Sequence, residues 1–197
     1  MSLDAPAAPG EVTRLLHDAR AGDPALIDRI VPLVYDDLRR VARRQLARVG
    51  ARTLRPTELV HEAYVKLAAG GGVNAGDREH FLAIAARAMR QLLVDHARNR
   101  NAVKRGAGWK RATLSGSHWV TDMDADELLA LDDAMAQLEP RQRQVVECRF
   151  FGGMEDTEIA AALGITDRTV RRDWVKARAW LYRALAERGM DAGTLPA

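Results

Sequence analysis

The residues of this 197-residue chain best suited to a chemical role lie in one C-terminal segment, Thr157–Trp174, and directly after it. Gly164 can adopt a left-handed turn conformation, and the Thr166 hydroxyl can cap a following helix. Apolar residues at helical spacing would face inward, which leaves a polar outer face consisting of Arg168, Thr169, Arg171, Arg172 and Lys176. Such a helix fits the major groove of DNA, where Arg is the commonest reader of guanine N7 and O6. The segment therefore predicts a DNA-binding helix-turn-helix in preference to an ordinary helical hairpin.

Charge is distributed along the chain in blocks. The total of 30 Lys+Arg and 27 Asp+Glu gives a net charge of +3. Leu38–Arg55 and Phe81–Arg111 each carry +7, Thr166–Arg183 carries +4, and Thr121–Pro140 carries −7. Three basic blocks favour a surface that binds a polyanion. The acidic block carries the opposite charge, so it is expected to have a different role from the basic segments. Arg supplies 26 of the 30 basic residues, which suits nucleic-acid binding and equally suits codon bias in a GC-rich genome.

The sequence argues against an enzyme. His61-Glu62 begins like the helix of a zinc protease, but position 65 is Val where the second zinc-binding His would stand. The five His residues are scattered along the chain, and Gly70–Gly72 lacks the Lys that would follow in a phosphate-binding loop. We therefore predict no catalytic residue, no metal and no cofactor.

The sequence also predicts a cytoplasmic protein without a membrane anchor. The longest stretches without a charge are ten residues, whereas a transmembrane helix needs about 20 apolar residues. The N-terminus has neither a basic region nor an apolar run, so it does not resemble a signal peptide. The single cysteine, Cys148, cannot form an intrachain disulfide, which is consistent with a reducing compartment.

Helical periodicity recurs along the chain, and strand patterns are nearly absent. Pro56 and Thr57 open one expected helix, which stops at the glycine run Gly70–Gly72. Asp77 can cap a long helix from Arg78 to about Arg100. An earlier stretch places Val34, Leu38, Val41 and Val49 near one helix face, with the basic face Arg39–Arg48 across from it. The further helices predicted are Asp126–Leu138, one from Pro140 to Gly152-Gly153, Asp156–Leu163 and Asp167–Arg188. The predicted fold class is all-α.

A segment without periodicity, rich in Gly and Ser, follows Lys104 and predicts a flexible linker. The expected organisation is two small helical domains joined by that linker, with the helix-turn-helix in the second. The predicted boundaries are a disordered tail 1–10, an N-terminal domain 11–105, the linker 106–125, a C-terminal domain 126–188 and a tail 189–197. The linker contains Trp109 and Trp119, whose role the sequence does not indicate.

From about Leu15 to Leu185 the chain resembles bacterial RNA polymerase sigma factors of the extracytoplasmic-function type. Residues 58–67 (ELVHEAYVKL) resemble the family's polymerase-binding segment, and residues 80–100 resemble the helix that melts and reads the downstream promoter element. Residues 138–153 with the helix-turn-helix resemble the domain that reads the upstream element. The resemblance implies a transcription initiation factor that is a monomer when free. The implied partners are core RNA polymerase and promoter DNA, with an anti-sigma protein as a further candidate.

The resemblance also implies roles for single residues. Glu58, His61 and Glu62 would face the clamp of the largest polymerase subunit. The residues that would line the melted element are Arg87, Arg90, Arg98, Arg100, Lys104 and Arg105, with Phe81 as the aromatic residue of this helix. Asn74 and Asp77 lie in the loop Gly70–Asp77, where the family captures a flipped base. An equally open interpretation is that the loop only connects two helices and that Asp77 is only a helix cap.

A conventional dimeric regulator with the same helix-turn-helix is the alternative function. It would need a ligand pocket or a dimer seam in the N-terminal half, which the basic face Arg39–Arg48 fits poorly. The mass of the free protein on size exclusion distinguishes the two, because the regulator would be a stable dimer.

Overall fold

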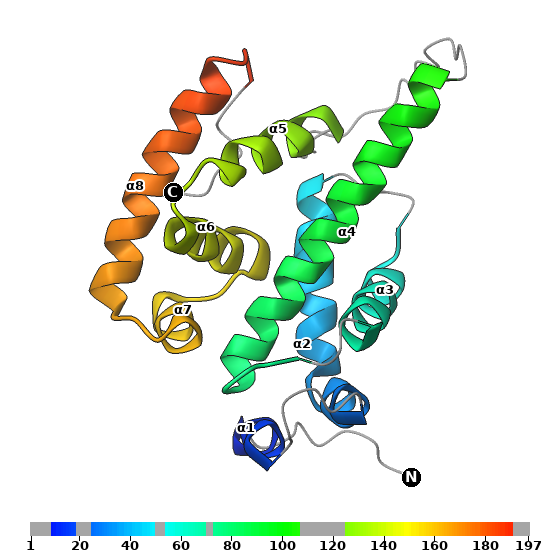
Figure 1. Ribbon diagram of the computed structural model, residues 1–197, viewed down its shortest axis with the longest axis vertical. Coiled ribbons are helices and arrows are strands. Elements are labelled where there is room, and N and C mark those ends of the chain that lie inside the picture. Colours follow the sequence, from blue (N-terminus) through cyan, green and yellow to red (C-terminus); the bar gives the residue numbers. More distant parts are fainter. Residues whose placement is uncertain (1–8, 19–24, 50–53, 70–72, 107–124, 191–197) are drawn as a thin grey trace.

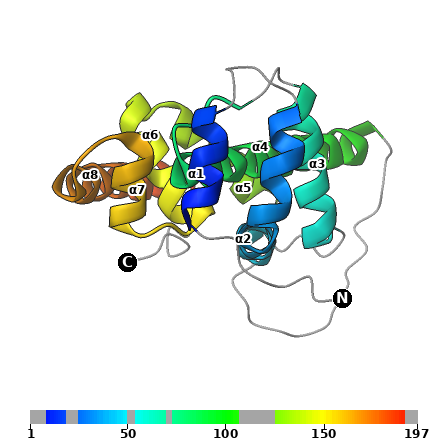
Figure 2. The same ribbon diagram turned by 90° about the horizontal axis from the view of Figure 1, so that it is seen from below.

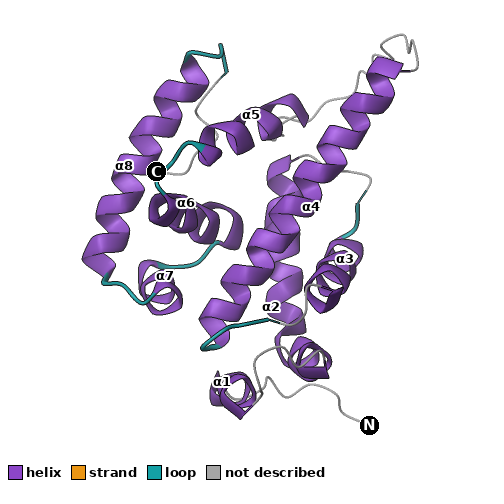
Figure 3. Ribbon diagram, in the orientation of Figure 1, coloured by secondary structure: helices purple, strands orange, loops and turns teal. Residues whose placement is uncertain are grey.

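The structure is a computed structural model that describes residues 9–18, 25–49, 54–69, 73–106 and 125–190. Helices are the regular elements of these residues, which contain no strand, so the predicted all-α fold is confirmed (Figure 3). The elements of the N-terminal half are α1 Pro9–Asp18, α2 Ala25–Val49, α3 Pro56–Ala69 and α4 Arg78–Gly106. Those of the C-terminal half are α5 Ala125–Ala136, α6 Pro140–Val146, the π-helix η1 Glu147–Gly152, α7 Asp156–Leu163 and α8 Asp167–Ala186 (Figure 1).

Local signals in the sequence set many of the helix ends. Pro56 and Pro140 begin α3 and α6, where the missing N–H of proline costs no helical hydrogen bond. At the start of α4, Asp77 Oδ1 accepts a hydrogen bond from the His80 N–H at 2.7 Å, as an N-cap does. Gly153 ends η1 with a φ of +66°, a backbone conformation that glycine adopts without steric cost. The predicted proline starts, aspartate cap and glycine stop are confirmed.

The N-terminal half is built around α4. Helices α2, α3 and α4 pack against one another, and α1 covers one end of α2. The Gln45 side chain is fully buried and donates a hydrogen bond to the Ala86 carbonyl at 3.0 Å, which ties α2 to α4. Helix α1 begins at Pro9, so residues 9 and 10 of the expected tail are helical, and α4 runs on to Gly106, past its predicted end near Arg100.

The C-terminal half packs on the opposite side of α4. Helices α5, α6 and α7 contact α8, while α5, η1 and α7 also contact α4 (Figures 1 and 2). Gly152 of η1 lies against α4, since a Cβ there would be in ordinary van der Waals contact with the Cβ of Ala86, at 3.5 Å. One continuous group of buried apolar residues extends through both halves. The division into two domains stays a prediction, and nearly all of the expected linker, with Trp109 and Trp119, lies outside the described residues.

No helix in the described ranges combines the length and the apolar character needed to cross a bilayer.

Candidate nucleic-acid interface

A tight turn joins α7 to α8. Gly164 has a φ of +63°, and the Ile165 N–H donates to the Ala160 carbonyl at 3.0 Å, which closes the end of α7. Thr166 then caps α8, because its Oγ1 accepts a hydrogen bond from the Thr169 N–H at 3.3 Å. Ile159, Val170 and Trp174 are buried and hold the two helices together. The expected roles of Gly164 and Thr166 are confirmed.

The outer face of α8 is basic and exposed. The exposed cations in its first three turns are Arg168, Arg171, Arg172 and Lys176, as the sequence predicts. Thr169 is half-buried, with its hydroxyl 3.0 Å from the Thr166 hydroxyl, so this side chain supports the cap. Val175 is 64% exposed and adds an apolar surface to the same helix. Four cations on the first turns of one helix form a surface suited to phosphates and base edges.

A buried carboxylate beside this face was missed by the sequence analysis. Asp173 is 2% exposed, and it accepts hydrogen bonds from Arg141 Nε at 2.5 Å and from Arg172 Nε at 3.5 Å. The hydrogen bond from Arg141 is the main cause that lowers the pKa of the Asp173 carboxyl below its usual value. The sequence signal for Asp173 was an acidic residue at an inward-facing position of a basic helix. A buried acid must be paired with a positive charge or a hydrogen-bond donor. Arg172 therefore points toward Asp173, whereas Arg171 makes no such contact with a carboxylate among the described residues.

The predicted polymerase-binding residues lie along α3. Glu58, His61 and Glu62 are all exposed. Glu58 also has a structural role, because its Oε2 accepts a hydrogen bond from the Arg55 N–H at 2.8 Å at the start of the helix. Figures 1 and 2 both place α3 and α8 on opposite sides of the molecule. A partner bound along α3 would thus leave α8 accessible.

The residues predicted for the downstream element do not share one environment. Arg87, Arg98 and Arg100 are exposed on α4, whereas Arg90 is 1% exposed and Phe81 is fully buried. In this conformation the Phe81 ring therefore has no face accessible to a base. Lys104 and Arg105 lie in the last turns of α4, and their side chains are outside the described part of the chain.

The two candidate residues of the loop before α4, Asn74 and Asp77, have different environments. Val73 and Ala75 are buried and anchor the described part of the loop, so Asn74 between them is exposed. Asp77 is occupied as the cap of α4. The His80 ring further fixes the turn, because its Nδ1 accepts a hydrogen bond from the Gly76 N–H at 3.3 Å. Asn74 is thus the side chain that the described loop presents outward.

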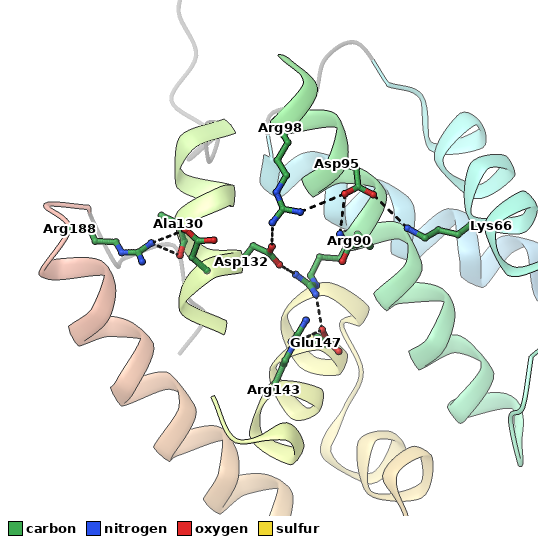
Figure 4. Close-up of polar contacts among 11 residues, drawn as sticks. Lys66, Arg90, Asp95, Arg98, Ala130, Asp132, Arg143, Glu147 and Arg188 are labelled. Atoms are coloured by element: carbon green, nitrogen blue, oxygen red, sulfur yellow. Dashed lines mark hydrogen bonds and ion pairs between the residues drawn. The ribbon is translucent and has the colours of Figure 1, made fainter. Parts of the chain in front are cut away.

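Arg90 is paired across the molecule (Figure 4). Its Nη2 donates to Glu147 Oε1 at 2.9 Å, and its Nη1 contacts Asp132. Glu147 is 4% exposed, and the side chain of Asp132 is 12% exposed. The sequence analysis missed both carboxylates. The available signal for Glu147 was an acid within the largely apolar stretch 145–151, which also contains Arg149, because a buried charge requires a partner.

Cys148 and the acidic groups of the described residues are also candidate chemical groups. Burial raises the pKa of the Cys148 thiol to about 12, so it is protonated at neutral pH. The described ranges contain no group of three His, Cys, Asp or Glu side chains arranged to hold a metal ion.

Comparison with known proteins places the chain in a family. A family model described as ECF sigma factor matches residues 9–187. Over 75 residues, 38% of this chain, it is 41% identical to the RNA polymerase sigma-E factor of Streptomyces antibioticus and 39% identical to that of Streptomyces coelicolor. These alignments span 41% and 42% of the two relatives, less than half of their lengths. The family match covers all the described helices, and the chain therefore belongs to the ECF sigma factor family.

Proposed function

We propose that the chain binds core RNA polymerase and directs it to promoters by contacting two DNA elements. In this proposal α7 and α8 form a helix-turn-helix that reads the upstream element. Helix α4 and Asn74 contact the downstream element as it melts, and α3 contacts the polymerase. The protein would act in the cytoplasm by binding alone, with no catalytic group or cofactor of its own.

The observation that carries the proposal is the exposed basic face of α8 on a rigid support. Arg168 and Arg171 lie in the first turns after the Thr166 cap, where a helix entering the major groove brings side chains to base edges. Asp173 accepts hydrogen bonds from Arg141 of α6 and from Arg172 of α8, which ties the basic helix to its neighbour. Membership of the ECF sigma factor family supports this assignment.

The contact with polymerase is assigned to the exposed edge of α3. Glu62 and His61 are exposed and lie one turn from Val65, which is 50% exposed. An acidic edge beside an exposed apolar residue suits a protein partner with a basic surface. This edge is far from α8 in Figure 1, so polymerase and upstream DNA could be bound together.

Run-off transcription with core polymerase on a library of promoters tests the proposal. The chain should direct initiation from a defined subset of templates that core polymerase alone does not use. Transcripts identical with and without the chain would contradict it. Light scattering on the free protein separates the dimeric-regulator alternative, which requires a stable dimer that binds DNA without polymerase.

A further inference from the structure

The guanidinium of Arg141, in the first turn of α6, is held at one end and open at the other. Its Nε lies 2.5 Å from Asp173 Oδ2, across the contact between α6 and α8 (Figure 1). The Asp173 side chain is 3% exposed, whereas that of Arg141 is 51% exposed. Arginine has five donors in a planar fork, and this contact uses the Nε donor. No described residue accepts a hydrogen bond from the two Nη groups, so the end of the fork is left for another acceptor.

Asp173 lies at the edge of the basic outer face of α8. It follows Arg172 in the sequence and stands one turn after Thr169 and one turn before Lys176. Arg172 Nε also approaches its carboxylate, at 3.5 Å. One buried carboxylate therefore has a cation from each of two helices beside it. This contact places Arg141 next to the edge of the basic face, although it comes from 32 residues away in the chain.

An ion pair that only ties two helices together can enclose both of its partners. The pair of Arg90 with Glu147 is of this kind, because the two side chains are 1% and 5% exposed. In the pair of Arg141 with Asp173 the carboxylate is enclosed and the guanidinium reaches solvent. Such a contact restricts a long side chain before a ligand arrives, which lowers the conformational entropy lost on binding. The arrangement suits an anion that lies outside the molecule beside α8.

We propose that Arg141 contacts a phosphate of the upstream DNA from outside the helix-turn-helix, and that Asp173 is its positioning residue. When α8 lies in the major groove, the backbone of a DNA strand borders the edge of the helix. The two Nη groups would donate to two oxygens of one phosphate, an arrangement that the guanidinium fork matches. The inference rests on the proposed reading of the upstream element by α8. It extends the DNA-binding surface to α6.

Two properties distinguish a phosphate contact from a base contact. Neutralising a phosphate releases counterions, so the loss of one contact should lower the slope of log affinity against log salt by about 0.9. Phosphates are the same in every sequence, so the loss should be uniform across upstream sequences. Arg141→Gln should therefore weaken promoter binding about fivefold at physiological salt, whichever upstream sequence the promoter has.

The test uses the full chain bound to core RNA polymerase. Affinity for fluorescent promoter duplexes is measured over a range of potassium chloride. One duplex contains the upstream element, and a matched duplex is truncated just downstream of it. Arg141→Gln should lose affinity on the first duplex and match the wild type on the second. Arg183→Gln removes an exposed cation near the end of α8, and as the control it should match the wild type on both.

Two further variants separate the DNA contact from folding and from net charge. Arg141→Gln leaves the buried Asp173 with Arg172 alone, so it is also combined with Asp173→Asn. The double variant has the wild-type net charge and a neutral pair at the same place, and circular dichroism checks its helices. It should lose affinity and salt slope as the single variant does. Asp173→Ala removes an acid near DNA, which would tighten binding if charge alone mattered, but loss of the anchor of Arg141 should weaken binding about twofold.

Each result supports or overturns a distinct part of the proposal. An unchanged salt slope in both Arg141 variants overturns the phosphate contact, as does a loss that persists on the truncated duplex or is confined to certain upstream sequences. Tighter binding by Asp173→Ala overturns the positioning role. Equal wild-type affinity for the two duplexes would instead contradict the proposed function, because α8 would then not contact the upstream element.

Discussion

Arg44 of α2 fills the space that a side chain at Gly153 would need. Its Nη1 lies 0.9 Å from the position of a Cβ on Gly153 and donates a hydrogen bond to the Gly152 carbonyl at 3.3 Å. Gly153 also has a φ of +66°, which costs an L-residue about 1–2 kcal/mol. The absence of a side chain at Gly153 therefore permits both the left-handed backbone turn and the contact of Arg44 in α2 with the Gly152 carbonyl in η1.

Gly153→Ala should lower the free energy of unfolding by about 2–3 kcal/mol, because backbone strain adds to the displacement of Arg44. Urea denaturation measures the change. Gly164→Ala is the matched control, since Gly164 has a φ of +63° and its added Cβ would meet no described residue within 4 Å beyond its immediate chain neighbours. It should show the strain alone. Equal losses would contradict a role for Arg44, and adding Arg44→Ala to both variants should remove their difference.

Asp173→Asn should destabilise the protein at pH 7 by about 1–3 kcal/mol, because it removes a charged acceptor from Arg141 and Arg172. The hydrogen bond from Arg141 lowers the pKa of Asp173 in the folded state, so its contribution is present above the unfolded-state pKa of about 4. The contribution is lost as the pH falls through the lower folded-state pKa. Urea unfolding from pH 7 into the acid range should therefore show wild type and variant converging. Exposed Asp133→Asn should show neither effect.

Arg171→Ala should weaken the preference for one upstream base pair by about 1–3 kcal/mol, the cost of a lost bidentate contact to guanine. Transcription from promoters varied at each upstream position measures the change. Lys176→Ala should weaken all promoters alike and reduce the dependence on salt, as loss of a phosphate contact does. Arg183→Ala, also exposed but near the end of α8, is the control. If Arg171→Ala reduced transcription equally from every promoter variant, Arg171 would be assigned to a phosphate contact instead of a base contact.

Glu62→Lys should reduce the affinity for core polymerase at least tenfold, since it places a cation on the edge proposed to meet a basic surface. Co-purification and fluorescence titration with core enzyme measure it. Glu58 is unsuited to this test because it caps α3 through the Arg55 N–H. Glu187→Lys, an exposed reversal at the end of α8, is the control. If Glu62→Lys left the affinity for core polymerase unchanged, the assignment of α3 to the polymerase interface would be wrong.

Asn74→Ala should reduce transcription strongly from duplex promoters and less from templates already mismatched at the downstream element. The reason is that a base-capturing side chain offsets the few kcal/mol needed to unstack a base. The exposed position of Asn74 between buried Val73 and Ala75 predicts that the change leaves the fold intact. Equal loss on both templates, or none on either, would leave the loop as a connection. Asp77→Ala would confound the result, because it removes the cap of α4.

The sequence by itself determined the features that depend on near neighbours. Pro140 starts a helix, Gly164 ends one, and Thr166 and Asp77 cap the helices that follow them. These effects act within about four residues, so the pattern of residue types contains the information that decides them. The basic face of α8 could be predicted for the same reason, because helical periodicity assigns each residue to a side of the helix. Helix α1 and the first part of α2 escaped prediction, and Pro32 inside α2 is a residue that usually ends a helix.

Only the tertiary structure decided which charged residues face water and which face each other. Arg90 and Arg98 lie in the same basic helix, yet Arg90 is buried against Glu147 and Asp132 while the Arg98 side chain is half exposed. The partners of Arg90 lie 42 and 57 residues away in the chain, and a charge pattern along a helix does not specify which element will pack against it. The same holds for the burial of Phe81 and for the pairing of Arg141 with Asp173. Such contacts depend on how separate helices stack, because a buried charge is tolerated only where packing brings a counter-charge to it.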